Sequence, residues 1–279
     1  MSTKAGQVQC LLRRLFHTRT TILTSGTLAV KDQDADFRSF RYDLGLLDGI
    51  HPVSTRIEPK RHGTLSIILA ERSLSTPKQD DPLRDEWLSY VARGIAAAHE
   101  EGGEVLVLTT NYADTGAIGE QLADLGVPFL AQSRGQRLAD LLLRRPAGTV
   151  FITPAGWEGL DSPGGWQHLI VPRIPYPPVG QAAKEDEFSF LNSQEVAMRR
   201  LRQALGRALR NPNDAATLWI LDPRFPVPAE MMRGGQATQQ KATGHLALAQ
   251  AIPERFRRSG IRRSAWDSAT MFHLAPVQQ

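Results

Sequence analysis

The amino-acid sequence predicts an α/β fold with a mainly parallel sheet and helices on both of its faces. Short, nearly continuous apolar runs recur along the chain, as expected of strands buried on both faces of a parallel sheet. Segments with helical patterning separate these runs, and alternation of this kind produces right-handed βαβ units. The expected strands are residues 19–28, 64–71, 104–110, 127–132, 149–155, 166–174 and 217–222.

Helix signals fill the intervals between the expected strands. The clearest helix, 81–103, starts after Pro82 and ends on the pair Gly102–Gly103, which fits the usual chemistry of helix ends. The other expected helices are 112–126, 134–145 and 185–210, the last as one long helix or two. Three stretches look irregular: 29–63, a proline-rich surface segment at 172–187, and a loop at 226–244.

Composition excludes several classes of protein. The chain has 279 residues, 41% of them hydrophobic and 22% charged, which is enough to form a core and is atypical of disorder. Cys10 is the sole cysteine, so the chain alone builds no disulfide and no iron–sulfur cluster. No apolar run approaches the ~20 residues of a membrane span, and we expect a cytoplasmic protein with no membrane partner. The net charge of +4 is compatible with nucleic-acid binding.

The sequence lacks the motifs of a self-sufficient nucleotide enzyme. It contains no GxxxxGK[ST] phosphate loop, no DExH-type box, no GxGxxG after the first strand and no GxSxG elbow. We therefore expect the chain to be incomplete as a catalyst. In parallel sheets, ligands bind outside the carboxyl ends of the strands, so the residues that follow each strand are the first candidates for a site.

One basic stretch, "RRLRQALGRALR" at 199–210, carries five arginines. Gln203, Arg207 and Arg210 are spaced four and three residues apart, so they share one helical face, which Arg199 extends. Gly206 leaves room beside Arg207 for close approach of a partner surface, at a cost of roughly 1 kcal/mol of helix propensity. A solvated basic helix with surface salt bridges has the same pattern. The opposite, apolar face consists of Leu201, Leu205 and Ala208.

Four motifs occur together with this stretch in a fixed order. They are "TILTSGTL" (21–28), "VLVLTTNY" (105–112), "GWEGLDSPG" (156–164) and "QALGRALR" (203–210), the last followed by "LWILDPRF" (218–225). In order and spacing they resemble the second motor domain of the XPD/DinG-like superfamily 2 helicases, over about residues 15–225. The resemblance implies a RecA-like three-layer domain, of the P-loop NTPase type but without its own phosphate loop.

The resemblance also implies roles for individual residues. Arg207 and Arg210 would act as arginine fingers on the γ-phosphate, and Gln203 would sense the nucleotide or its attacking water. We expect Arg207 to face the rim where strands 104–110 and 149–155 end. Residues expected beside the nucleotide are Glu158, Gly159, Asp161 and Gly206.

Residues expected at the nucleic-acid backbone are Thr24, Thr27, Thr109 and Thr110. Tyr112 and Trp157 are expected to pack in the core, and Arg173 to have a structural role.

The implied function is the C-terminal motor half of an ATP-dependent DNA helicase with 5′-to-3′ polarity. ATP and Mg²⁺ would be held mainly by an N-terminal motor domain outside this sequence, and this chain alone is expected to be inactive. Single-stranded DNA and that motor domain are the expected partners. The chain would be either a fragment or a natural split or truncated product. A CRISPR-associated (type IV) DinG is one compatible sub-branch, and it would add a CRISPR ribonucleoprotein as a partner.

We expect one RecA-like domain over 1–258 and a basic, then apolar tail at 259–279. The arginines around this tail would either track a single strand or solubilise the chain. Two other functions remain open. One is a non-catalytic RecA-like nucleic-acid-binding module or split-helicase subunit, and the other is an unrelated α/β enzyme with a site of its own.

Overall fold

The computed structural model describes residues 63–70, 81–157, 160, 165–177, 187–226, 247–257, 261–265 and 272–274, with isolated positions (14, 16, 21–23 and 41) before them. The elements are β1 (Thr64–Ala70), α3 (Arg84–Glu100), β2 (Val105–Leu108), α4 (Tyr112–Asp124), β3 (Phe129–Ala131), α5 (Leu138–Arg144), β4 (Val150–Thr153), β5 (His168–Val171), α6 (Glu187–Ala208), β6 (Ala215–Ile220), the 3-10 helix η2 (Ala247–Ala251), α9 (Glu254–Arg257), β7 (Ile261–Ala265) and β8 (His273–Leu274).

All of these strands form one sheet, in the order β3-β4-β2-β5-β6-β1-β7-β8. Every neighbouring pair from β3 to β7 is parallel, and β8 alone runs antiparallel, against β7. Parallel strands need crossover connections, which the helices provide. The structure therefore confirms the predicted mainly parallel α/β sheet, with six of the seven expected strands at their expected places.

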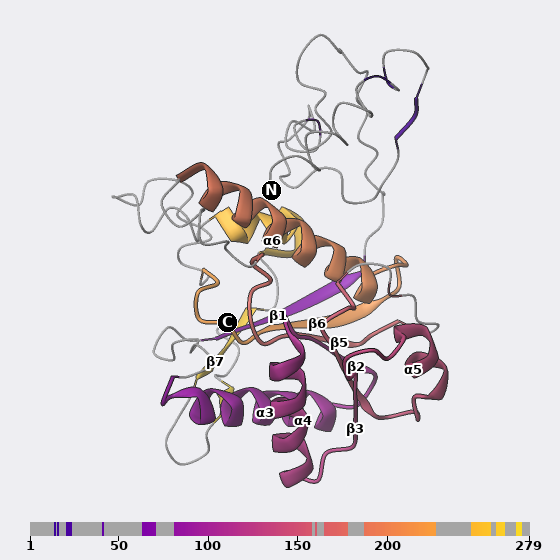
Figure 1. Ribbon diagram of the computed structural model, residues 1–279, viewed down its shortest axis with the longest axis vertical. Helices are drawn as coiled ribbons and strands as arrows, with labels where there is room; N and C mark the ends of the chain where they lie inside the picture. The colour runs from indigo at the N-terminus through magenta and orange to yellow at the C-terminus, as the bar shows by residue number, and fades with distance from the viewer. Residues whose placement is uncertain are drawn as a thin grey trace. The chain divides into compact units, whose positions relative to one another are not determined.

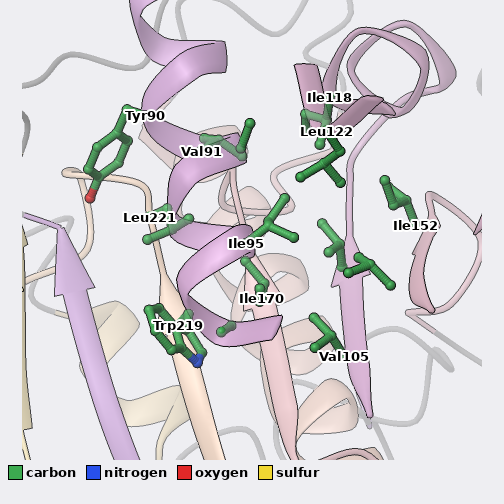
Figure 2. Packing of buried hydrophobic residues seen from close by; sticks show 14 of the residues in the cluster. Tyr90, Val91, Ile95, Val105, Ile118, Leu122, Ile152, Ile170, Trp219 and Leu221 are labelled. Atoms are coloured by element: carbon green, nitrogen blue, oxygen red, sulfur yellow. The ribbon is translucent and has the colours of Figure 1, made fainter. Parts of the chain in front are cut away.

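The sheet is the middle of three layers. Helices α3 and α4 cover one face and α6 covers the other (Figure 1). On the α3 and α4 face, Val91 and Ile95 from α3 pack with Ile118 and Leu122 from α4 over Ile170 and other strand residues (Figure 2). Alternate strand residues point to the opposite face. Burial on both faces explains why these strands are continuous apolar runs.

Helix α6 is one helix of 22 residues. Its apolar face is buried as the sequence predicts, with Leu201 3%, Leu205 6% and Ala208 4% exposed. On its other side Arg202 donates hydrogen bonds to the carbonyls of Gln250 (3.2 Å) and Ala251 (3.4 Å), which attach η2 to the helix.

The sheet does not end where the sequence analysis places the end of the domain. Strand β7, within the expected tail, adds to β1 with Ile67 paired to Ile261. Ser264 of β7 is buried, and its hydroxyl lies 2.7 Å from the Tyr90 hydroxyl of α3. Residues 261–265 of the expected tail are therefore part of this sheet. By its contacts the chain divides into two units, Met1–Lys60 and Arg61–Gln279.

Three further expectations need correction. Residues 21–23 are exposed and lie outside any strand, and the rest of the expected strand 19–28 is outside the described residues. The expected helix 134–145 starts only at Leu138, because a turn precedes it. The start of segment 172–187 does not lie on the surface, since Ile174 is 1% exposed. Among the described residues, no helix is both long and apolar enough to cross a membrane.

His168, at the start of β5, is held as a neutral side chain. Trp219 Nε1 donates to His168 Nδ1 at 3.2 Å, so Nε2 carries the proton and donates to the carbonyl of Gly102 at 2.9 Å. Burial lowers the pKa of His168, against smaller raising effects from Gly102 and the carboxylate of Glu101. The protonated ring would lose its bond with Trp219.

Stability should therefore fall in mild acid. Because the pKa of His168 is lower in the folded chain, the unfolded chain binds more protons as the pH falls. The stabilisation is complete above the unfolded pKa of about 6.5 and decreases below it. We expect His168→Gln, which keeps a donor for Gly102, to have a smaller loss of stability than wild type between about pH 8 and pH 5. Urea unfolding measures this, and parallel pH profiles would contradict it.

Candidate nucleotide and nucleic-acid site

A hydroxyl-rich turn follows β2 at the carboxyl edge of the sheet. Asn111 caps α4, accepting a hydrogen bond from the backbone N–H of Asp114 at 2.7 Å. Thr109 is 1% exposed, and its hydroxyl lies 2.6 Å from that of Thr115. Its side chain therefore holds the turn and does not reach a ligand, contrary to the expected backbone contact. Thr110, half-buried, is the threonine of the pair that reaches the surface.

The carboxylate of Asp114 joins three elements at this edge. It is buried, and it accepts hydrogen bonds from Arg84 of α3 at 2.8 Å and from Arg173, which follows β5, at 3.2 Å. The guanidinium carbon of Arg173 also lies 4.6 Å from the ring centroid of Trp87. Both contacts support the structural role expected for Arg173.

The connection that leaves β4 starts at the same edge. Gly156 is required there, because an added Cβ would lie 2.6 Å from the Leu108 side chain and 2.9 Å from that of Thr153. Trp157 is 6% exposed and packs inside, as expected for this residue. Its Nε1 donates to the carbonyl of Thr109 at 2.7 Å, which fixes the connection to the turn after β2. Further along, Leu160 is fully buried.

The two predicted finger arginines converge on this connection. Arg207 Nη1 donates to the carbonyl of Leu160 at 2.8 Å, and Arg210 Nη2 donates to the same oxygen at 3.3 Å. Arg207 lies in the last turn of α6 and is half-buried, whereas Arg210 lies just beyond the helix and is exposed. Two guanidinium groups therefore meet at one acceptor oxygen.

The arginines do not lie at the carboxyl edge, where the sequence analysis places them. Helix α6 connects β5 to the parallel β6, so it runs back toward the amino ends of the strands. The backbone N–H of Arg210 donates to Asp214 at 2.7 Å, and the carbonyl of Asp214 accepts from Thr64 at the start of β1. Arg207 does contact the connection that leaves β4 at the expected rim. It makes this contact from the α6 face of the sheet and away from the carboxyl edge.

The other two residues expected on this helix face lie close to the arginines. Gln203 is half-buried one turn before Arg207, and within the described part of the chain its Oε1 is buried without a hydrogen-bond partner. Gly206 is exposed, and an added Cβ would meet no atom of the described residues within 4 Å. None of these residues therefore fills the space beside Gly206.

Gly206→Ala tests whether that space is used. The change should raise the free energy of unfolding of the isolated chain by about 0.5–1 kcal/mol, because alanine favours the helix and fits without a clash. In a motor whose partner domain packs on this face, the same methyl group should lower ATP turnover. Gly116→Ala is the matched control, since Gly116 is also an exposed helical glycine with open space around it. Equal turnover in both variants would contradict close packing at Gly206.

An ion pair between the buried Asp222 and the partly exposed Arg224 supports the carboxyl end of β6. Asp222 is 0% exposed and accepts hydrogen bonds from the backbone N–H of Ile174 at 2.8 Å and from Arg224 Nη2 at 2.6 Å. Burial would raise the pKa of Asp222, but the hydrogen bonds and charge of Arg224 hold it below the ordinary value. Arg224 lies over Tyr176, where burial raises the pKa of the phenol to about 12.

Part of the expected site lies outside the described residues. These positions are Thr24, Thr27, Glu158, Gly159 and Asp161. Sequence reasoning also missed residues that organise the site, namely Asp114 with its two arginines and the bond from Trp157. The sequence did contain a signal for Asp114, because "NYAD" at 111–114 fits the pattern of a helix cap followed by an acid three residues later. The bond between Trp157 and Thr109 has no such local signal.

The mainly parallel sheet between two helical layers, with the arginine-bearing α6 on one face, defines a three-layer α/β domain. Residues 95–233 match the family described as helicase C-terminal domain. The ATP-dependent DNA helicase XPD of Sulfolobus acidocaldarius is 24% identical over 226 residues, which cover 73% of this chain. Over residues 95–233 the chain is therefore similar to helicase C-terminal domains, and it is similar to an XPD helicase over part of that protein's length.

The similarity covers only part of the relative. The matched residues are 39% of the Sulfolobus acidocaldarius helicase. Among solved structures, an XPD helicase shares 19% identity, covering 60% of this chain and 33% of its own, with a TM-score of 0.47. The Xpd4 protein of S. tokodaii shares 16% identity, covering 68% and 44%, with a TM-score of 0.44.

Proposed function

We propose that this domain is the C-terminal motor half of an ATP-dependent DNA helicase of the DinG/XPD type, with 5′-to-3′ polarity. The family match at 95–233 supports the proposal, because it contains both α6 and the connection that the arginines contact. The related protein from Sulfolobus acidocaldarius is described as an ATP-dependent DNA helicase. In the proposed enzyme, ATP and Mg²⁺ are held mainly by an N-terminal motor domain, and this chain closes the site.

The convergence of Arg207 and Arg210 on one oxygen is the observation that carries this role. Two guanidinium groups around a single acceptor suit the oxygens of a phosphate, which carry more negative charge than a carbonyl. Arg207 would stabilise the charge that develops on the γ-phosphate during its transfer. Gln203 lies one turn away, with a buried amide oxygen suited to orienting a water or a donor group of the nucleotide.

The connection after β4 offers a physical route between the two ligands. It is hydrogen-bonded to the turn after β2 through Trp157 and to α6 through the carbonyl of Leu160. We propose that Thr110, beside this turn, contacts the nucleic-acid backbone. A shift of the arginines toward phosphate would release Leu160 and so alter the position of the turn.

The test is the ATPase activity of this chain joined to a motor domain that carries a phosphate loop. We expect ATP hydrolysis that is stimulated by single-stranded DNA from the joined protein and none from this chain alone. Salt-dependent DNA binding by this chain with no ATPase in any joined form would instead support the non-catalytic module. Hydrolysis by this chain alone would contradict both functions.

A further inference from the structure

The short segment between α6 and β6 is folded around the carboxylate of Asp214. One oxygen of this side chain, Oδ2, accepts hydrogen bonds from the backbone N–H groups of Asn211 at 2.6 Å and Arg210 at 2.7 Å. The bond from Asn211, and then that from Arg210, hold the pKa of the Asp214 carboxyl below its ordinary value. The side chain is therefore charged at neutral pH, and a charged acceptor strengthens both bonds. The carboxylate thus holds the backbone at Arg210, two residues beyond the end of α6 at Ala208.

The backbone of Asp214 is itself attached to the sheet. Its carbonyl accepts the N–H of Thr64, the first residue of β1, at 2.8 Å, and Thr64 is paired with Ala215, the first residue of β6. The approach is close, because a Cβ added at Gly63 would collide with the carbonyl oxygen of Asp214. Asp214 therefore links two strands of the sheet, through its carbonyl, to the backbone of Arg210, through its carboxylate.

This link bears on the position of the second finger arginine. The guanidinium groups of Arg207 and Arg210 both donate to the carbonyl of Leu160, at 2.8 and 3.3 Å. Arg207 is half-buried on α6, so the packing of the helix sets its place. Arg210 is exposed and lies beyond the helix. Because its long side chain has many rotamers, the place of its guanidinium depends on where its backbone is fixed.

We propose that Asp214 is a positioning residue for Arg210 in ATP hydrolysis by the joined motor. Its carboxylate holds the backbone of Arg210 so that the guanidinium stays beside that of Arg207 and both meet one phosphate group. Donors that are fixed before the reaction stabilise a developing charge most effectively. Asp214 acts only through Arg210, because an anion repels the phosphates of the nucleotide. The inference rests on the proposed function and deepens it, by naming the group that places one of its two cations.

Single-turnover hydrolysis and ATP affinity of the joined motor test this role. Asp214→Ala should lower turnover roughly 10- to 100-fold with little change in ATP affinity, because the guanidinium is then misplaced for the transition state. Asp214→Asn keeps an acceptor oxygen without the charge, and its turnover should lie between those of Asp214→Ala and wild type. On an Arg210→Ala background, Asp214→Ala should cause no further loss, because the group that it positions is absent.

Asp81→Ala is the matched control. Asp81 also accepts a backbone N–H at its side chain, that of Leu83 at 2.9 Å, but it precedes α3, which covers the face of the sheet opposite α6 (Figure 1). Its turnover should stay close to that of wild type. In this chain alone, NMR should show faster hydrogen exchange at the amides of Arg210 and Asn211 in Asp214→Ala than in wild type. Thermal unfolding checks that each variant is folded, and Asp214→Asn replaces Asp214→Ala if the latter is not.

The outcomes separate this role from the proposed function. Wild-type turnover in Asp214→Ala or Arg210→Ala, with DNA-stimulated hydrolysis by the unchanged motor, would overturn the positioning role and leave the motor assignment intact. A full further loss on the Arg210→Ala background, an equal loss in Asp81→Ala, or a parallel loss of ATP affinity would also overturn it, because Asp214 would then act on the fold in general. Unchanged amide exchange would remove the contact on which the role depends. An unchanged motor without any hydrolysis would refute the proposed function, and this role with it.

Discussion

Arg207→Ala in the joined motor should lower ATP turnover by about 10³-fold or more while the affinity for ATP changes little. A guanidinium that reaches the γ-phosphate only during transfer stabilises the transition state more than the bound substrate. Arg207→Lys should rescue only a small part of the loss, because an ammonium group lacks the planar fork that binds two oxygens. Single-turnover hydrolysis measured beside nucleotide binding separates the two effects.

The control for this experiment is on the same helix. Arg200 donates to the carbonyl of Pro175 at 3.3 Å and lies outside the proposed site, so Arg200→Ala removes an equal charge from α6. Its turnover should stay close to that of wild type. Unchanged turnover in Arg207→Ala, or a parallel loss of ATP binding and turnover, would contradict the finger role.

Asp222→Asn should destabilise the isolated chain by about 1–3 kcal/mol, because it weakens the charge-assisted hydrogen bonds of a buried carboxylate, while the partly exposed guanidinium of Arg224 can still be hydrated. For a domain of this size the melting temperature should fall by roughly 2–12 °C. The amide that replaces the carboxylate would still accept one hydrogen bond, so the backbone N–H of Ile174 can keep its partner. Thermal and urea unfolding of wild type and variant measure the effect.

Asp85→Asn provides the comparison for Asp222→Asn. Asp85 is an exposed carboxylate in the first turn of α3, where neutralisation should cost well under 1 kcal/mol. A loss for Asp222→Asn no larger than that of Asp85→Asn would show that the ion pair contributes little to stability. The pair would then serve only to position the segment after β5.

The sequence predicted the central strands well because each is buried on both faces and so is apolar throughout. Strand β7 was missed for the opposite reason. Its sequence, "IRRSA", has two adjacent arginines, since it lies toward the edge of the sheet and is covered less completely. Arg262 is half-buried, with Nη1 3.8 Å from Glu101 of α3. Polar strands near an edge have no continuous apolar run to detect.

The candidate site was predicted in part. Helical spacing predicted one face with Gln203, Arg207 and Arg210, and the structure has the first two on α6 and Arg210 just beyond its end. Spacing could not reveal that Thr109 is buried against Thr115. It also could not reveal that the two arginines lie away from the carboxyl edge of the sheet, because neither fact follows from local spacing.

The amino-acid sequence by itself determined the α/β class, the succession of strands and helices along the central part of the chain, and the apolar face of α6. These features depend on periodicity over a few residues, and burial imposes that periodicity directly on the chain. Only the tertiary structure decided that Leu160 receives both arginines, that Trp157 attaches its connection to β2, and that β7 completes the sheet beside β1. Such contacts join residues far apart in sequence, so the packing of the whole sheet and its helices selects them.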